Sequence, residues 1–473
     1  MTNQPKKATT RRKPAASKKE DPPVYLLSME VEDLLCFKER QTLNLSNKNG
    51  HPAQWTVILG NNGVGKTTLL RCLAGMEMRP EIYEYPIVVD GVEQFEEAKE
   101  FQPMLWNFYD FEEIWEEIGI ATYTGETIPA ISVSFASNIT LNSFNTDKNL
   151  DIQKDYVSIV IDSELSLPSE EFKGATFYGY GATRKMGETS LSDSNTSYHS
   201  ASLFSDDTLL INAEEWLLQT DYAVKSSSGK TRTRLRKQFK QIIEVLKQIL
   251  PDVEDICIDL DEYLARPTAK FLTPFGWVRL SSLGLGYRTT IAWMVDLAVR
   301  LFKRYPDSED PLAEPAIVLV DEIDLHMHPK WQRDIMQFLT DRFPNTQFIV
   351  TAHSPLVVQA AQDANIVLLR REGDRVVIDN NPEIIENWRV DQVLTSVFEM
   401  PSARPAKIEP LLQRRKELLT KPKLTASDRA ELKELEAKIG TLPTAETFED
   451  IKAMDIIRRA AKLLDDPVTE AVE

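Results

Sequence analysis

The residues of this chain that could do chemistry begin with a glycine-rich turn between an apolar strand, Thr56–Leu59, and a helix predicted over Thr68–Met76. A strand, a glycine-rich turn and a helix in this order are typical of a phosphate-binding loop. Glycines let backbone N–H groups turn inward around phosphates, Lys66 can reach the β- and γ-phosphate oxygens, and the Thr67 hydroxyl can bind Mg²⁺. The residues assigned to the nucleotide are Gly60, Asn61, Asn62, Gly63, Val64, Gly65, Lys66, Thr67 and Thr68.

Two adjacent carboxylates, Asp321 and Glu322, follow a second apolar strand, Ile317–Val320. In an open α/β sheet, ligands bind at the C-terminal ends of the strands, so a buried strand would deliver both acids beside the phosphate loop. Asp321 is expected to hold Mg²⁺, and Glu322 is expected to polarise the attacking water.

A histidine, His353, lies just past a third apolar strand, Phe348–Val350. A histidine there can hydrogen-bond the γ-phosphate and the attacking water, although taken alone it is more often an ordinary loop residue. His326 and His328 also follow the acids, but their spacing without further ligands argues against a metal pair. The candidate catalytic residues are Lys66, Glu322 and His353, with ATP as the substrate and Mg²⁺ as the cofactor.

Serines and glycines precede a long apolar helix predicted at Tyr287–Phe302. Hydroxyl groups and glycine N–H groups at a helix N-terminus form an anion site. Because the phosphate loop already supplies a helix N-terminus to the same nucleotide, the second one indicates that two copies of the chain share ATP. The residues assigned to this contact in trans are Ser282, Gly284 and Gly286.

Together these motifs resemble the ATP-binding cassette heads of the SMC, RecF and OLD branch of AAA-type ATPases. Gly60–Thr67 corresponds to Walker A, Leu280–Arg288 to the signature, Asp321 and Glu322 to Walker B, and His353 to the switch histidine. The resemblance implies that two heads sandwich two ATP molecules, each signature capping the γ-phosphate bound by the other head.

The sequence departs from the family pattern at three places. Gly284 stands where a serine usually precedes Gly286, which leaves Ser282 in a shifted register, and His328 replaces the aspartate of the interface loop. No glutamine can be assigned to the Q-loop, and Gly179–Arg184 is expected in its neighbourhood. The turn Asp321–Pro329 looks like RecF- and OLD-type proteins rather than transporter subunits.

The alternation of apolar strands and helices predicts an α/β P-loop NTPase fold of the ATP-binding cassette head type, with a mostly parallel central sheet and an antiparallel flap. Tyr25–Val31 and Gln41–Leu45 begin the flap. The expected organisation is a disordered basic tail at 1–22, the first part of the head at 23–77, an inserted subdomain and helical arm at 78–270, the second part of the head at 271–400 and a C-terminal helical region at 401–473.

Residues 78–270 contain a cationic cluster on a predicted helix, with Arg232, Arg234, Arg236 and Lys237 as the candidate contacts to nucleic-acid phosphates. A solvated helix face is an equally good explanation. The same segment carries a Ser/Asp-rich loop at 189–208, which is expected to be mobile. Aromatic residues expected in the core of a subdomain are Trp106, Phe108, Tyr109, Phe111 and Trp115.

The C-terminal region predicts a hairpin of two amphipathic helices, 408–420 and 426–438, followed by a third helix at Glu449–Leu464. The apolar faces fit packing within the chain, and docking of a partner is the alternative.

Composition narrows the classes of function. The chain has 473 residues and a formal net charge of −18, which argues against a protein that coats nucleic acid with its whole surface. Its three cysteines lack metal or disulfide spacing, and no apolar run approaches the length of a membrane span, so a cytoplasmic protein without a membrane partner is expected. The basic tail is expected to be solubilising, with nucleic-acid contact as the alternative.

The predicted function is an ATPase that forms a dimer or higher oligomer on ATP and couples hydrolysis to sensing or clamping of nucleic acid, in DNA repair or anti-phage defence. A nuclease or other effector would be a separate partner, as the resemblance to PtuA-like ATPases implies. The alternatives are the ATP-binding subunit of an ABC transporter and a non-hydrolysing ATP-dependent scaffold. Large insertions disfavour the first, and an intact set of Lys66, Asp321 and Glu322 disfavours the second.

Overall fold

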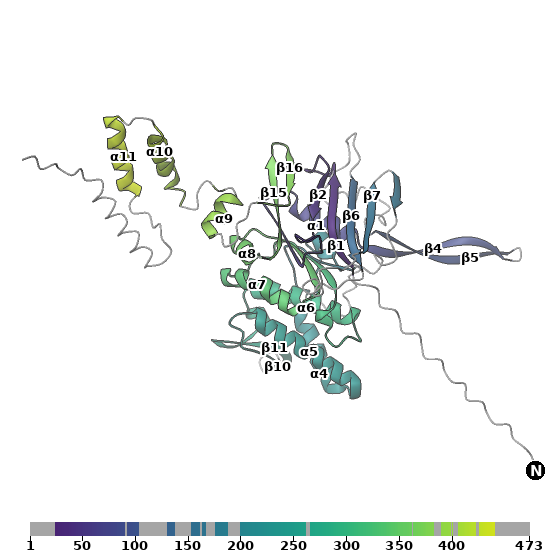
Figure 1. The fold of residues 1–473 in the computed structure, drawn as a ribbon. Helices are drawn as coiled ribbons and strands as arrows, with labels where there is room; N and C mark the ends of the chain where they lie inside the picture. Colours follow the sequence, from purple (N-terminus) through teal and green to yellow (C-terminus); the bar gives the residue numbers. More distant parts are fainter. Residues whose placement is uncertain are drawn as a thin grey trace, which may run out of the picture. The chain divides into compact units, whose positions relative to one another are not determined.

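The computed structural model places the predicted motifs in a layered α/β arrangement (Figure 1). Residues up to Val393 form one compact unit, and residues from Leu394 onward form a second unit. The structure describes residues 24–89, 92–103, 130–137, 153–160, 163–166, 176–187, 199–261, 265–361, 363–382, 389–398, 400, 405–421 and 425–439.

A six-stranded sheet positions the phosphate loop and the Walker B acids. Its strands lie in the order β16-β15-β3-β14-β13-β9, and all neighbours are parallel except β15 and β16. Residues that follow the parallel strands therefore reach the same edge of the sheet. The strands are Trp55–Gly60 (β3), Phe177–Tyr180 (β9), Ala316–Val320 (β13), Thr346–Thr351 (β14), Asn365–Glu372 (β15) and Arg375–Asp379 (β16).

Every residue of β3, β13 and β14 is buried, because both faces of the sheet are covered. Ile58 and Ile349 face a core shared with helix α1 (Lys66–Gly75) and with the antiparallel sheet described below. On the opposite face, the Tyr180 ring lies 5.6 Å from the Trp293 ring of helix α6. Burial on both faces explains why these strands are mostly apolar and do not alternate between apolar and polar residues.

A second sheet has five antiparallel strands in the order β2-β1-β6-β7-β8. The Gln347 side chain of β14 fastens it to the central sheet by hydrogen bonds of 2.8 Å to both the N–H and the carbonyl of Leu26. A further pair, β4 and β5, forms a separate two-stranded sheet. The strands are Val24–Glu32 (β1), Gln41–Asn44 (β2), Met78–Val89 (β4), Val92–Pro103 (β5), Ala130–Ser137 (β6), Gln153–Val160 (β7) and Ser163–Ser166 (β8).

Two parts of the segment 78–270 belong to the sheets of the head, although the sequence predicted an inserted subdomain there. Strands β6 to β8 extend the flap from β1, and β9 forms an edge of the central sheet beside β13. Such pairings join residues far apart in sequence, which a pattern of local runs does not reveal. The aromatic residues Trp106, Phe108, Tyr109, Phe111 and Trp115 lie outside the described residues, as does the first half of the loop 189–208.

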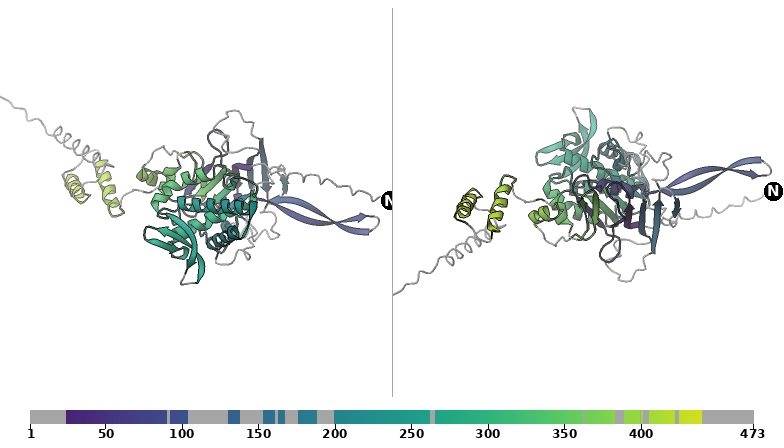
Figure 2. Two further views of the ribbon diagram at one scale, coloured as in Figure 1. Left: turned by 90° about the horizontal axis from the view of Figure 1, so that it is seen from below. Right: turned by 90° about the horizontal axis from the view of Figure 1, so that it is seen from above.

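Helices α4 to α7 lie beside one another, on the side of the central sheet away from the antiparallel sheet (Figures 1 and 2). None of the helices in the described ranges is both long and apolar enough to span a membrane. Their bounds are Ala201–Phe204 (α3), Ala213–Ser226 (α4), Gly229–Ile249 (α5), Leu285–Arg304 (α6), Pro329–Arg342 (α7), Pro355–Ala360 (α8) and Val390–Ser396 (α9), with 3₁₀ turns at Leu280–Ser282 (η4) and Pro311–Ala313 (η5).

A three-stranded antiparallel sheet packs against α4 and α5. Its strands are Asp255–Asp261 (β10), Arg266–Thr273 (β11) and Gly276–Arg279 (β12). A tight turn at residues 274–275 divides the segment into β11 and β12. Proline at the turn explains the break, since Pro274 lacks the N–H that a continuing strand would need.

The second unit contains the predicted helical hairpin, formed by α10 (Glu409–Leu419) and α11 (Ala426–Ile439). Leu418 and Leu435 are buried between the helices. Arg414 of α10 donates two hydrogen bonds to Glu431 of α11, at 2.7 and 3.1 Å. The two helices therefore pack against each other, and the helix predicted at Glu449–Leu464 lies outside the described residues.

Candidate functional site

The turn from β3 into α1 has a backbone that only glycine adopts without strain at several positions. Gly60, Gly63 and Gly65 have φ angles of 148°, 77° and 85°. A Cβ added at Gly60 would lie 2.7 Å from the Leu369 carbonyl oxygen, and one added at Gly65 would lie 2.8 Å from Cε2 of the Phe37 ring. The loop backbone therefore packs directly against Leu369 and Phe37. Helix α1 begins at Lys66, two residues before the predicted start.

Lys66 lies inside this turn and is only 6 % exposed. Its Nζ donates hydrogen bonds of 2.9 Å to the carbonyl oxygens of Gly60 and Asn61. Burial lowers the pKa of Lys66, and the nearby charges of Asp321 and Glu322 oppose that shift. The ammonium group is thus held beside the Walker B acids rather than in solvent.

A chain of short hydrogen bonds joins the phosphate loop, β13 and β14. Thr67 Oγ1 donates to Asp321 Oδ2 at 2.7 Å, although the two residues are 254 positions apart. Thr351 Oγ1, at the end of β14, donates to the other oxygen of the same carboxylate at 2.6 Å. Asp321 is buried, and each of its carboxylate oxygens accepts a hydrogen bond from a threonine hydroxyl, as a buried carboxylate requires.

Glu322 has an unusual backbone for a residue with a side chain, with φ at 48°. Its N–H donates to Thr351 Oγ1 at 2.7 Å, and its carbonyl oxygen accepts from the Leu325 N–H at 3.0 Å. The left-handed conformation costs of order 1–3 kcal/mol and is retained where surrounding contacts require it. The side chain of Glu322 is half-buried.

His353 follows β14 and lies close to the same groups. Its backbone N–H donates to both carboxylate oxygens of Asp324, at 3.2 and 3.3 Å. Burial of the ring, together with the charge of Lys66, holds the pKa of His353 below its usual value, and Asp324 opposes the shift. The imidazole is therefore neutral at neutral pH, and a neutral ring can both donate and accept a hydrogen bond.

Arg184 is a member of this site that the sequence did not single out by itself. Its Nη2 donates to the carbonyl oxygen of Glu322 at 2.5 Å, and its side chain is buried. The segment Gly179–Arg184, which was expected near the Q-loop, lies at the end of the sheet that carries the phosphate loop, because β9 runs parallel to β13. A signal available in the sequence was the arginine itself, four residues beyond an apolar strand.

The predicted signature residues lie at the start of α6. Ser282 ends η4, Gly284 caps α6, and both are exposed. Gly286 lies in the first turn of α6, where an added Cβ would meet the His326 carbonyl oxygen at 2.2 Å. Helix α6 extends from Leu285 to Arg304, so the predicted span was short at both ends. Among the described residues no hydrogen bond connects these signature positions with the phosphate loop.

A protein family described as "AAA domain, putative AbiEii toxin, Type IV TA system" matches residues 55–359. The match begins at β3 and ends within α8, and it includes the residues assigned to Walker A, the signature, Walker B and the switch histidine. The chain belongs to this AAA family.

Several bacterial proteins are similar to this AAA protein. The retron Vc95 probable ATPase of Vibrio cholerae serotype O1 biovar El Tor is 37% identical over 143 residues, which cover 30% of this chain and 27% of the relative. The Septu protein PtuA of Bacillus mycoides (strain KBAB4) is 26% identical over 390 residues, 82% of this chain and 46% of the relative. The retron Ec83 probable ATPase of Escherichia coli is 39% identical over 158 residues, 33% of this chain and 28% of the relative. The chain spans less than half the length of these relatives.

Among solved structures, an SMC head bound to the C-terminal winged-helix domain of ScpA matches 75% of this chain and 97% of its own, with 12% identity and a TM-score of 0.40. The SMC head domain from Thermotoga maritima matches 76% of this chain and 99% of its own, with 12% identity and a TM-score of 0.38.

The cationic cluster of this AAA protein lies on the first half of α5. Its arginines and lysine are exposed, and the buried residues of α5 begin only at Ile242. In the part of the chain that the structure describes, these side chains take part in no ion pair or hydrogen bond. They are Arg232, Arg234, Arg236 and Lys237.

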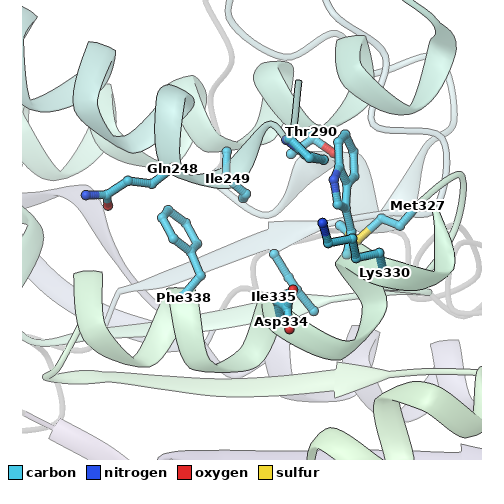
Figure 3. A pocket seen from close by; sticks show the side chains of 10 residues that line it. Gln248, Ile249, Thr290, Met327, Lys330, Asp334, Ile335 and Phe338 are labelled. Carbon is cyan, nitrogen blue, oxygen red and sulfur yellow. The ribbon is translucent and has the colours of Figure 1, made fainter. Parts of the chain in front are cut away.

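A small cavity of about 90 Å³ lies elsewhere in the AAA protein, between α5, α6 and α7 (Figure 3). Apolar side chains such as Ile249, Ile335 and Phe338 line it. The Trp331 ring also lines it, and its buried N–H has no hydrogen-bond partner in the described structure. None of the predicted catalytic residues faces this cavity.

Proposed function

We propose that this protein hydrolyses ATP with Mg²⁺ and does so as a dimer or higher oligomer in which two heads share the nucleotides. The hydrogen bond between Thr67 and Asp321 carries the proposal, because it joins Walker A to Walker B. It is supported by membership of an AAA family and by relatives named as probable ATPases.

The phosphate loop fits a nucleotide. Its glycines leave no room for a Cβ at two positions, which lets backbone N–H groups approach phosphates closely. Lys66 would move its ammonium group from the loop carbonyls to the phosphate oxygens, where the charge of the ligand is greatest. The side chain needs no further dehydration for this, since it is already buried.

The residues beside the loop also fit Mg²⁺. The Thr67 hydroxyl and the Asp321 carboxylate oxygen lie 2.7 Å apart, so both could ligate one cation. In the described part of the chain no group of three or more His, Cys, Asp or Glu could hold a metal alone. Mg²⁺ matches this sparse set, because it binds through one or two protein oxygens together with substrate phosphates. When bound, it would neutralise phosphate charge.

Glu322 and His353 are the proposed catalytic groups for the attacking water. Glu322 follows the buried Asp321 and would orient and polarise that water. His353 is neutral, so it can hydrogen-bond the water or the γ-phosphate without adding charge. Lys66 would stabilise the negative charge on the transferred phosphoryl group.

The signature is proposed to complete the site in the second copy of the chain. Ser282 and Gly284 are exposed, as a contact in trans requires. Gly286 packs against the carbonyl of His326, in the turn after Walker B. A shift of the signature on ATP binding would therefore move the turn that follows Glu322. The proposal includes Ser282, Gly284 and Gly286 as the trans contacts to ATP.

The exposed face of α5 is proposed to contact nucleic acid, and a separate nuclease or effector is proposed as a partner. Four cations without protein partners in the described structure suit a phosphate backbone. The similarity to a Septu protein and to retron ATPases supports a role in anti-phage defence, and DNA repair is the alternative. Three free cysteines fit the reducing cytoplasm as the proposed location.

Steady-state ATPase activity, measured with and without duplex DNA, tests this function. We expect wild-type turnover to be stimulated by DNA, and Glu322→Gln to reduce kcat by about 10²- to 10⁴-fold while ATP still binds. ATP-bound dimers or higher oligomers should then accumulate, which size-exclusion chromatography with light scattering would detect. Asp341→Asn, which removes an exposed carboxylate from α7, is the matched control and should behave as wild type.

Each outcome separates the parts of the proposal. Hydrolysis that survives Glu322→Gln would reject the catalytic assignment. Glu322-dependent hydrolysis that ignores DNA would retain the ATPase and reject nucleic acid as its trigger, in favour of a protein trigger.

A further inference from the structure

Arg184 enters the Walker B region from the neighbouring edge strand. β9 is parallel to β13 with Tyr180 opposite Val320, so the residues after both strands lie at the same C-terminal end of the sheet. The Asp321 N–H donates to the Tyr180 carbonyl at 2.8 Å, which extends the strand pairing to the first acid. Arg184 is thereby brought to Glu322, the second acid.

The turn that carries Arg184 is tightly held. Ser202 Oγ donates to the Gly179 carbonyl at 2.9 Å and accepts from the Gly181 N–H at 3.3 Å. A Cβ added at Gly181 would lie 2.0 Å from the Ser202 carbonyl oxygen, so no other residue fits there without movement. Arg184 itself has φ at 38°, an uncommon value for an arginine. These contacts fix the backbone of the segment and hold the Arg184 side chain against Glu322.

The guanidinium of Arg184 is a buried charge among acids. Arg184 is 2 % exposed, and burial lowers its pKa to about 10 even though Asp321, Asp324 and Glu322 oppose the shift. At pH 7 the group therefore remains protonated. A buried cation costs several kcal/mol in lost hydration unless nearby groups compensate, and here three carboxylates do so.

The hydrogen bond from Nη2 goes to the backbone of Glu322 rather than to a carboxylate. Together with the Thr351 hydroxyl, which accepts from the Glu322 N–H, it fixes both peptide groups that flank the Glu322 side chain. These contacts hold the left-handed φ of 48° that determines where the side chain points. In the described structure the buried Nε of Arg184 has no hydrogen-bond partner, which is uncommon for a buried donor.

We propose that Arg184 is a positioning residue for Glu322: its guanidinium holds the Glu322 carbonyl, and thereby aims the carboxylate at the attacking water. This inference rests on the proposed ATPase function. Because the contact acts on Glu322 and not on the phosphate loop, Arg184 contributes to turnover rather than to nucleotide affinity. Its effect also requires that Glu322 be a carboxylate able to polarise water.

The test is a double-mutant cycle with Arg184→Gln and Glu322→Gln. Single-turnover hydrolysis measures the catalytic step, and titration with a fluorescent ATP analogue measures affinity. Arg184→Gln should reduce the hydrolysis rate at least tenfold and change the dissociation constant less than threefold. In the Glu322→Gln background the same change should alter the residual rate less than twofold, because residues that act as a unit are not additive.

Arg184→Lys and Arg342→Gln are the companion variants. Lysine retains the charge and a donor, so it should recover part of the lost rate and still be silent in the Glu322→Gln background. If Arg184→Gln does not fold, the lysine variant carries the cycle alone. Arg342 forms a two-bond pair with Asp310, at 3.0 and 3.2 Å, away from the site, and Arg342→Gln controls for loss of a partly buried ion pair. Its hydrolysis rate should remain within twofold of wild type.

Two outcomes would overturn the positioning role. Equal losses from Arg184→Gln in both backgrounds would show that Arg184 acts independently of Glu322, and a loss of affinity as large as the loss of rate would place it on the nucleotide. If wild-type turnover does not depend on Glu322 at all, the proposed function fails and the positioning role fails with it.

Discussion

The nucleotide end of the head and the exposed half of α5 are both rich in charge, yet the two regions hold their charges in opposite ways. Lys66, Arg184 and Asp321 are each less than a tenth exposed and have defined hydrogen-bond partners. On α5, by contrast, the cations of the cluster are exposed, and their side chains have no partner in the described structure. Buried charges are preorganised for one ligand geometry, whereas exposed cations suit any ligand that presents many phosphates.

The largest difference between the two regions should appear when one cation is removed from the buried site. Lys66→Ala should weaken ATP binding by roughly ten- to a hundredfold, since a hydrogen bond to a charged group contributes about 1.5–3 kcal/mol. Equilibrium titration with a fluorescent ATP analogue measures the effect. Lys38→Ala removes an exposed lysine that pairs with Asp374 and is the matched control.

An affinity within twofold of wild type for Lys66→Ala would contradict the assignment of Lys66 to the phosphates. The same measurement on Lys38→Ala should show no change, because exposed ion pairs contribute little.

The sequence predicted the buried region well where one local pattern was enough. β3, β13 and β14 are mostly apolar, and the candidate site residues come at or just after their C-terminal ends, which parallel pairing brings together. The start of α1 at Lys66 was missed because a left-handed glycine, Gly65, directly precedes the helix. A glycine-rich turn does not reveal which of its glycines is the last outside the helix.

Arg184 shows what local patterns leave out. β9 has only four residues, and its place beside β13 depends on pairing across a long stretch of chain. The contact from Arg184 is made to a backbone carbonyl, which any residue at position 322 would present, so no pair of residue types identifies it. The role of Thr351 is similar, because a threonine at the end of a strand is common and its bonds to Asp321 and Glu322 appear only in the fold.

On α5, reversal of several charges at once should produce a graded loss of DNA affinity. Replacing the cluster with glutamates should weaken duplex DNA binding and make the dependence of log affinity on log salt concentration shallower, by about 0.9 for each DNA phosphate that the protein no longer neutralises. Fluorescence anisotropy between 50 and 200 mM salt is a suitable measurement. The four positions are Arg232, Arg234, Arg236 and Lys237.

A control with the same change of net charge separates a local contact from a general electrostatic effect. Four exposed cations outside α5 can be replaced by glutamate in the same way. This variant should leave the dependence of log affinity on log salt concentration unchanged. The four cations are Lys48, Lys407, Arg429 and Lys433. Equal effects of the two sets would return the α5 cluster to an ordinary solvated helix face.

The smallest expected effect concerns His353, which belongs to the buried region but is only half-buried. Burial and the Lys66 charge lower its pKa, so the folded protein keeps the ring neutral at pH values where the unfolded chain already protonates it. Protonation therefore opposes folding, and stability should fall as pH drops through the usual histidine range. His353→Gln keeps a neutral hydrogen-bonding group and should remove that component.

Urea unfolding of wild type and His353→Gln between about pH 7.5 and 5.5 measures this component, because the free energies of unfolding of the two should diverge as pH falls. Turnover should depend on the same group. Wild-type kcat should decrease once pH falls through the lowered pKa of His353, and the variant should have a severalfold lower kcat that depends less on acidic pH. If both proteins show the same pH dependence of stability and of kcat, His353 titrates as an exposed histidine does. His353 would then be an ordinary loop residue.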